Sequence, residues 1–340
     1  MLQEVAGKSD APDVSKLQQI PLIETGSDFP LTTLMAEEQR AHALLDLATH
    51  RAPASALKVL DSISRRWLVK WNNRHLDEID AIAKRLARPG AYFLSVNYEW
   101  ACTCRVAPSP DGKSARLVRV LDWKTPGLGE NICAARVKGG AGEFLTMTWP
   151  GYTGVLQVMA PGRFSIALNQ APMPAPIGVF LMDWAANRRR VWRMPHQTAA
   201  HLLRQVCEEA VSYADAKEML MTEKIAAPAI YSLAGMTAQE TCVIERMEEK
   251  SSVRNGVAIA ANHWQDGRWT GHHRGVDSPG REQQMCHVGT EFDTDFKWLK
   301  SPVLNPRTRL AMVADASEGR VIAKGFENGR GATKTLDLVM

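Results

Sequence analysis

From residue 91 to the C-terminus the chain is dominated by short runs of β-branched and aromatic residues that glycine or proline separates. The first two runs, 91–107 and 115–123, flank a turn at 108–112 and predict a β-hairpin. A helical segment at 196–220 interrupts the strand-like runs. Further strands are predicted at 131–137, 144–149, 153–159, 164–168, 228–234, 240–246, 256–261, 309–314 and 320–325. Strands, helices and strands in this order favour an α+β body of packed layers.

The N-terminal third differs in character. Residues 1–34 are polar, contain proline and show no sustained period, so we expect an extended or partly disordered lead. Residues 35–87 are helical in pattern, most clearly at 56–72, where leucine, isoleucine and tryptophan recur every three or four positions opposite lysine and arginine. The Pro-Gly pair at 89–90 is expected to end this helical region.

Composition excludes several classes of function. The chain has 340 residues, is 45% hydrophobic and 23% charged, and has no apolar run of membrane-spanning length. Its first residues, MLQEVAGKSDAPDVSK, carry early acids and no apolar core, so we expect no secretory signal and a cytoplasmic protein. A net charge of +4 is too small to indicate nucleic-acid binding, and the basic run at 188–190 is interpreted as a solvated turn or helix face.

Two cysteines stand close together at the start of the predicted hairpin. Cys102 and Cys104 are two apart and therefore share one face of a strand. A redox pair is disfavoured because bridging these positions strains disulfide geometry. A metal site completed by one of the histidines at 272, 273 or 287 lacks a recognised ligand spacing. From the local residues, two buried thiols remain an open alternative to a nucleophile.

The hairpin and later segments resemble a known family in the same order along the chain. The matching segments are YFLSVNYEWACTCRVA and RVLDW in the hairpin, then GYTG at 151, FSIALN at 164, SYADAK at 212, IYSLAG at 230, CVIER at 242, Asn262, and PVLN at 302. Across roughly residues 90–326 the chain is similar to the acid ceramidase and N-acylethanolamine acid amidase family, within the choloylglycine hydrolase group.

The resemblance implies a fold and a maturation step. The implied fold is the four-layer αββα sandwich of N-terminal nucleophile hydrolases. Residues 1–101 would be a largely helical N-terminal subunit or propeptide, and 102–340 the catalytic subunit of the same precursor. Family members cut themselves before a cysteine, here between Ala101 and Cys102, which frees an α-amine. Such an amine has a pKa near ~8 and can act as a general base for the thiol of its own residue.

The resemblance also assigns roles to residues around Cys102. Arg119 would stabilise the thiolate, Asp122 would orient the new α-ammonium, and Asn262 would donate to the oxyanion. On an ideal strand, positions 119 and 122 lie on opposite faces, so this pairing predicts that the strand ends or bends near Leu121. A downstream arginine of the family falls near Arg281, which is a candidate catalytic residue, with a plain surface arginine as the alternative. Implied substrate-binding residues are Asn169, Gln170, Trp123 and Tyr152.

The implied activity is hydrolysis of a linear amide C–N bond in an N-acyl amide with a fatty chain, such as an N-acylethanolamine or a ceramide, with no metal or cofactor. In the lipid amidases the N-terminal subunit also engages membranes. The basic amphipathic helix at 56–72 suits such a peripheral contact, although its apolar stripe can equally pack against the body.

Departures from the family leave alternatives open. Val120 replaces an asparagine of the family pattern, Gln170 replaces a glutamate, and Cys104 replaces a serine. These substitutions put the substrate in doubt more than the reaction type. One alternative is an acyltransferase of the penicillin-maturing type, in which an amine takes the acyl group. The other is an uncleaved, non-catalytic relative that binds lipid or a partner.

Overall fold

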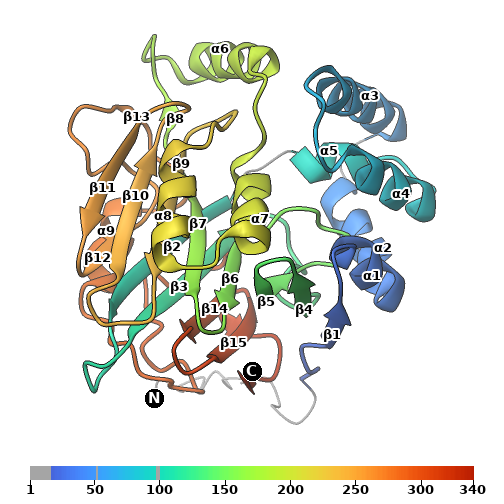
Figure 1. Ribbon diagram of the computed structural model, residues 1–340. Coiled ribbons are helices and arrows are strands. Elements are labelled where there is room, and N and C mark those ends of the chain that lie inside the picture. Colours follow the sequence, from blue (N-terminus) through green and yellow to red (C-terminus); the bar gives the residue numbers. More distant parts are fainter. Residues whose placement is uncertain (1–16, 51–52, 97–99) are drawn as a thin grey trace, which may run out of the picture.

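The structure is a computed structural model that describes residues 17–50, 53–96 and 100–340. Two large β-sheets pack face to face in these parts of the chain (Figure 1). Helices α7 (Ala199–Glu209) and α8 (Tyr213–Thr222) cover the outer face of one sheet, and α9 (Ser278–Met285) packs on the other. The predicted four-layer αββα sandwich is therefore confirmed.

The first sheet has eight strands in the described part of the chain, in the order β1-β4-β5-β6-β7-β9-β10-β11. Their bounds are β1 (Leu22–Thr25), β4 (Cys133–Gly139), β5 (Gly142–Thr148), β6 (Gln157–Ala160), β7 (Phe164–Gln170), β9 (Ala229–Ala234), β10 (Thr241–Arg246) and β11 (Ser251–Asn255). Strand β1 pairs in parallel with β4, and the other neighbours are antiparallel. The N-terminal third of the chain thus supplies an edge strand to the body.

The second sheet contains the candidate nucleophile. Its order is β12-β2-β3-β14-β15-β16, with β17 also paired to β15. The bounds are β2 (Trp100–Pro108), β3 (Ala115–Trp123), β12 (Ala258–Ala260), β14 (Thr308–Asp315), β15 (Arg320–Glu327), β16 (Arg330–Gly331) and β17 (Leu336–Val339). A small third sheet joins β8 (Met173–Pro174) to β13 (Gly271–His272). The predicted hairpin is present as β2 and β3, although its first strand is shorter than the expected 91–107.

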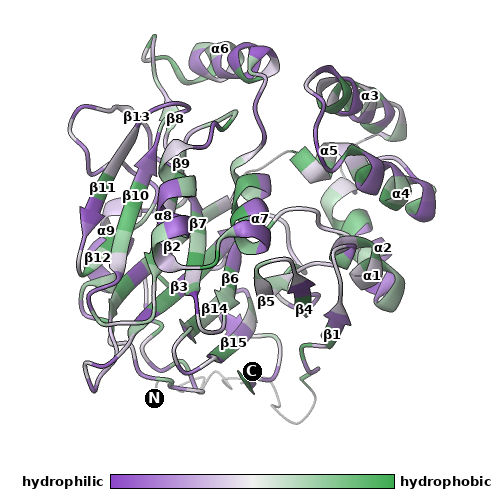
Figure 2. Cartoon of the chain, in the orientation of Figure 1, coloured by the Kyte–Doolittle hydropathy of each residue, from purple (hydrophilic) through white to green (hydrophobic). Residues whose placement is uncertain are grey.

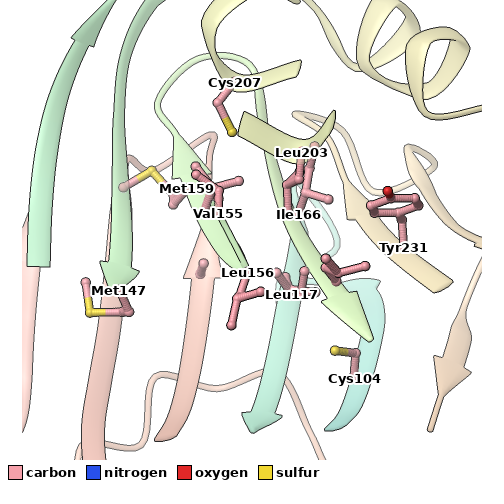
Figure 3. Close-up of a cluster of buried hydrophobic side chains, with 14 of the residues drawn as sticks. Cys104, Leu117, Met147, Val155, Leu156, Met159, Ile166, Leu203, Cys207 and Tyr231 are labelled. Carbon is pink, nitrogen blue, oxygen red and sulfur yellow. The ribbon is translucent and has the colours of Figure 1, made fainter. Parts of the chain in front are cut away.

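Burial explains why these strands read as nearly continuous apolar runs. The inner faces of both sheets meet in one large core, and a second core lies between the second sheet and α9 with its following loop. Figure 3 shows part of the first core, where Cys104 of β2 and Cys207 of α7 lie at different edges of an apolar cluster. Figure 2 shows hydrophobic β7 and β10 beneath helices with hydrophilic faces. Strands that are covered on both sides lose the polar alternation of a solvated sheet.

The N-terminal helices form a group at one side of the sheets (Figure 1). They are α1 (Phe29–Ala36), α2 (Glu38–Thr49), α3 (Ala54–Lys70), α4 (Leu76–Leu86) and α5 (Ala91–Val96), and α6 (Phe180–Arg193) lies on the same side as α3. The indole nitrogens of Trp67 and Trp71 donate to the carbonyls of Val191 and Trp192 at 3.1 and 3.2 Å. The C-terminal end of the α3 stripe therefore packs against the body, as one of its two interpretations expected, whereas Ile63 stays exposed. Membrane contact through 56–72 stays a prediction.

Some sequence predictions were wrong. Residues 91–96 form helix α5 and not a strand, and β2 begins only at Trp100. Residues 17–34 are not an extended lead, because they contain β1 and the start of α1. The rest of that lead, 1–16, and residues 97–99 of the family resemblance lie outside the described residues. The basic run at 188–190 lies on a helix, α6, as one of its two interpretations expected.

Within the described residues, none of the helices combines the length and the apolar character that a membrane span requires.

Candidate active site

Antiparallel pairing of β2 with β3 sets the faces on which the candidate residues lie. Cys102 is opposite Leu121 and Cys104 is opposite Arg119, so these four side chains share the inner face. Ala101 is opposite Asp122, which lies on the outer face. Strand β3 continues without a break to Trp123, so the predicted end or bend near Leu121 is wrong. The irregularity is instead a shift of register in β14, between Thr308 and Leu310.

The inner face holds a fully buried arginine beside the two thiols. Nη1 of Arg119 donates to Oδ1 of Asn169 at 2.5 Å and to the sulfur of Cys104 at 3.3 Å. Cys104 also donates to the same Asn169 oxygen at 3.0 Å. Nε and Nη2 of Arg119 have no hydrogen-bond partner among the described residues. Buried donors of a charged group are costly to leave unpaired, so this guanidinium is suited to an anion on the same face.

The environment of the Cys102 thiol favours its neutral form. Its side chain is fully buried, and the sulfur lies 3.8 Å from the carbonyl oxygen of Leu168. Burial raises the pKa of the Cys102 thiol to about 12, although Arg119 and Arg281 both act to lower it. The thiols of Cys102 and Cys104 in turn raise the pKa of Arg119 against the opposing effect of its burial. A cation therefore lies beside the Cys102 thiol, but desolvation dominates the pKa of that thiol.

Asn262 follows β12 and holds the backbone nitrogen of Cys102. Its Oδ1 accepts the Cys102 N–H at 2.7 Å and a second bond from Nη2 of Arg281 at 3.0 Å. Its Nδ2 donates to the carbonyl oxygen of Gln170 at 2.7 Å. The opposite amide orientation would set NH₂ against two donors and its oxygen against a carbonyl, so the hydrogen-bond network allows only this one. The group predicted to donate to an oxyanion is thus bonded to Gln170 in the uncut chain.

Arg281 and Asp122 complete the outer face. Nη1 of Arg281 donates to the Cys102 carbonyl at 2.7 Å and to the Thr103 hydroxyl at 2.9 Å. Its side chain is fully buried on α9, so the alternative of a plain surface arginine is excluded. The Asp122 carboxylate lies 3.8 Å from Nη1 of Arg281. Burial raises the pKa of Asp122, with Arg281 opposing that shift.

A cavity of about 330 Å³ adjoins this cluster. Its lining includes Leu168, Asn169 and Gln170 at the end of β7, and Trp67 of α3. The rest comes mainly from α6, the β8 segment and 226–229, and it is largely apolar. Cys102 itself does not line the cavity, although Leu168, whose carbonyl its sulfur contacts, does. Both the N-terminal helices and the body therefore form the cavity wall.

Trp100 separates the cavity from the aromatic residues that the resemblance assigned to substrate binding. It lines the cavity, and its backbone N–H donates to Oε1 of Gln170 at 3.2 Å. Its ring stacks on Trp123 at 5.3 Å, and the aromatic chain continues through Trp149 to Tyr152. Asn169 and Gln170 thus line the cavity. Trp123 and Tyr152 do not line it, because Trp100 lies between them and the cavity. A role of these two aromatic residues toward substrate stays a prediction.

Sequence reasoning missed several residues that support the site. Asn305 and Thr308 each donate to Asp122 at 2.9 Å. Asn305 belongs to the PVLN segment of the family resemblance, which could have indicated it. Ser278 accepts the backbone N–H of Asn262 at 2.8 Å, and no motif singled it out. In the described part of the chain, no group of three or more His, Cys, Asp or Glu is arranged to hold a metal ion.

The chain is similar in sequence to acid ceramidases and in fold to a solved amidase. No protein-family model matches the chain. Acid ceramidase of Homo sapiens is 28% identical over 188 residues, and that of Mus musculus is 32% identical over 192 residues. Each match covers 52% of this chain and 46% of the relative, so the chain spans about half the length of the curated relatives it matches. Among solved structures, the Caenorhabditis elegans N-acylethanolamine-hydrolyzing acid amidase ortholog matches with a TM-score of 0.50 and 21% identity, over 70% of this chain and 100% of that one.

The layer order and the comparison with the solved amidase define the fold as that of the N-terminal nucleophile hydrolases. The sequence matches show in addition that about half of the chain is similar to acid ceramidases.

Proposed function

We propose that this chain is a self-processing cysteine amidohydrolase that cuts itself between Ala101 and Cys102. The observation that carries the proposal is the pair of hydrogen bonds on Cys102. Asn262 accepts from its nitrogen and Arg281 donates to its carbonyl, so both sides of this residue are held. Strand β12 pairs with β2 only as far as Cys104, so the side chains of Asn262 and Arg281 take the place of a neighbouring strand at Cys102. Such side chains can move when the bond is cut, which supports chemistry at this residue.

The cutting step needs no group beyond those of the site and water. The sulfur of Cys102 attacks the carbonyl carbon of Ala101, the C–N bond breaks, and the nitrogen takes a proton to become the α-amine. Water then hydrolyses the thioester that joins Ala101 to the sulfur. The unpaired donors of Arg119 suit the thiolate. Before the cut, the Cys102 nitrogen is an amide that cannot act as a general base, so the uncut chain would be latent toward external amides.

Turnover repeats the same chemistry on an external amide. The free α-amine of Cys102 takes the thiol proton, the sulfur attacks the acyl carbon, and the amine half leaves with the proton. Water then releases the acid from the thioester. Asp122 lies opposite Ala101 on the partner strand and would orient the new ammonium. Asn262, released from the peptide nitrogen, would turn a donor toward the oxyanion.

The cavity supports an N-acyl amide with an apolar chain, such as a fatty N-acylethanolamine or a ceramide-like amide. Its apolar wall runs from α3 and α6 to Leu168, whose carbonyl oxygen lies 3.8 Å from the Cys102 sulfur. Trp100 belongs to the segment that cutting would detach from Cys102, and it forms part of this wall. Separation of Trp100 from the nucleophile would therefore open a path between cavity and thiol.

Val120 and Gln170 depart from the family pattern and could indicate a non-catalytic relative, but neither residue removes a contact of the site. Val120 packs in the apolar cluster between the second sheet and α9. The amide of Gln170 accepts the Trp100 N–H, as a carboxylate could, and its backbone carbonyl holds Asn262.

Intact-mass measurement of the purified full chain tests the proposal. We expect two fragments dividing at 101/102, and none in the Cys102→Ala variant. The Cys104→Ser variant is the matched control, because a hydroxyl can keep the bonds to Arg119 and Asn169. A wild-type chain that stays whole in long incubations at neutral and acidic pH would refute self-processing. Release of free fatty acid from a panel of N-acyl amides then tests hydrolysis, and addition of a competing amine separates it from acyl transfer.

A further inference from the structure

Three side chains behind Asn262 form a hydrogen-bonded chain that the reaction above does not use. The Ser278 hydroxyl lies 2.8 Å from Nδ1 of His263, and Nε2 of His263 lies 2.9 Å from Oε2 of Glu282. Ser278 and Glu282 are both on α9, one turn apart, and His263 directly follows Asn262. These hydrogen bonds therefore connect the helix that carries Arg281 to the loop that carries Asn262.

The directions of these bonds follow from the groups present. In the neutral tautomer with the hydrogen on Nε2, His263 donates to Glu282, because a carboxylate only accepts; Nε2 of Gln265 also lies 2.9 Å from this ring nitrogen. Nδ1 is then an acceptor and takes the hydroxyl hydrogen of Ser278. The Ser278 oxygen in turn accepts the backbone N–H of Asn262 at 2.8 Å. Gln265 also donates to Oε2 of Glu282, at 2.6 Å, and holds this carboxylate at the end of the hydrogen-bond network.

Burial shows that this arrangement is not a second nucleophile. Ser278 is 3% exposed, and its oxygen already accepts the Asn262 N–H. The imidazole is 10% exposed and the carboxylate 18% exposed, so solvent reaches only the far end. The buried Ser278 hydroxyl links the backbone N–H of Asn262 to the His263 ring. Such a link can hold the Asn262 loop in one position, because each donor in the hydrogen-bond network has its own acceptor.

We propose that His263 and Ser278 are positioning residues that act on Cys102 through Asn262. This inference rests on the proposed function. Asn262 places one carboxamide on the Cys102 nitrogen, on Arg281 and on Gln170, so displacement of its backbone disturbs all three contacts at once. Misplacement of a reacting group by about 1 Å can cost roughly 100-fold in rate.

The test measures self-cleavage and then kcat and KM of the matured enzyme. Ser278→Ala removes one oxygen, and His263→Leu removes the acceptor. We expect each to slow cleavage roughly 10-fold or more and to lower kcat with little change in KM. His263→Asn keeps an oxygen that can accept from Ser278 and should recover most of the rate. His273→Leu is the matched control, because that ring lies 5.4 Å from His263 and contacts neither Ser278 nor Glu282 through a hydrogen bond between described residues; it should keep the wild-type rate.

The double variant Ser278→Ala, His263→Leu distinguishes an effect of His263 that passes through Ser278 from two independent losses of local order. If His263 acts through Ser278, His263→Leu should add no further loss to Ser278→Ala, whereas independent effects multiply. Wild-type rates in both single variants, multiplied losses in the double variant, or an equal loss in His273→Leu would each overturn the inference. A wild-type chain that does not cut at 101/102 would instead refute the proposed function itself.

Discussion

The side-chain oxygen of Asn262 lies 2.7 Å from the backbone nitrogen of Cys102 and accepts its hydrogen. Before cleavage, Asn262 is therefore an acceptor for the nitrogen that would become the general base, and its amide group is bonded to Gln170. In the proposed turnover the same side chain acts as a donor. The proposed reaction therefore gives Asn262 two separable roles, one in each stage.

Asn262→Asp should separate these roles. An aspartate keeps the acceptor for Cys102 and Arg281 but replaces the donor to Gln170 with an oxygen. We expect self-cleavage to continue within about tenfold of the wild-type rate, while turnover falls by roughly 100- to 1,000-fold, the effect of losing one oxyanion donor. Asn262→Ala should lose both steps. Intact mass over time and fatty-acid release measure the two rates, and equal losses in Asn262→Asp would contradict the division of roles.

Arg119 should matter for the charge of the nucleophile and less for folding. Arg119→Lys retains a cation but cannot bond to Asn169 and a thiolate together. We expect turnover to fall by about tenfold with lysine and further with leucine. Removal of a cation raises a thiol pKa, so the pH at which alkylation of Cys102 accelerates should move upward in Arg119→Leu. Arg320→Lys, at an exposed pair with Asp337, is the control and should change neither quantity. An unshifted alkylation profile would remove Arg119 from the proposed role.

The two fragments should remain associated after cleavage. Strand β1 stays paired with β4, and Arg204 of α7 bonds to Glu78 of α4 and to the Ser27 carbonyl. We expect the fragments to elute together on size exclusion and to separate only in denaturant. Arg204→Met leaves Glu78 unpaired at this interface, where burial already raises the pKa of that carboxyl, and should weaken the association. Free dissociation of the wild-type fragments under native conditions would show that these contacts do not suffice.

Acid should destabilise the interface between α4 and α7. His75 and His201 stack at 4.6 Å there, and burial lowers the pKa of both, to about 3 for His201. A lowered histidine pKa means that folding favours the neutral ring. The stability that it contributes is therefore complete above the unfolded pKa of about 6.5 and is lost as pH falls toward the folded pKa. Each ring contributes a loss of up to roughly 1.4 kcal/mol per pH unit in that window.

Urea unfolding at pH 7 and pH 5 measures this loss. His201→Gln keeps a partner for the Thr153 hydroxyl, to which His201 is bonded at 3.1 Å, but cannot be protonated. The difference in unfolding free energy between the two pH values should therefore be smaller in this variant than in the wild type. The raised pKa values of Glu78 and Asp122 act in the opposite direction, so the comparison is between variant and wild type. Identical differences in both proteins would exclude the histidine pair as the cause.

Much of the fold was predictable because it depends on local pattern. The hairpin of β2 and β3 and the packed stripe of α3 follow from alternation and from three- and four-residue spacing. Residues 91–96 were mistaken for a strand because aromatic and β-branched composition does not distinguish a short buried helix from a strand. Strand β1 was missed because it is a short edge strand whose pairing partner, β4, lies more than a hundred residues away.

The sequence by itself determined the residue types at the site and their order along the chain, including Cys102, Arg119, Asp122, Asn262 and Arg281. It also determined that Cys102 and Cys104 share a face, because side chains alternate along any strand. Only the tertiary structure decided which way the Asn262 amide points and which donors of Arg119 stay unpaired. It also decided that desolvation outweighs the neighbouring cations at the Cys102 thiol. These properties depend on hydrogen bonds and burial between groups far apart in the sequence, such as Cys102 and Asn262, which are 160 residues apart, and no local pattern encodes them.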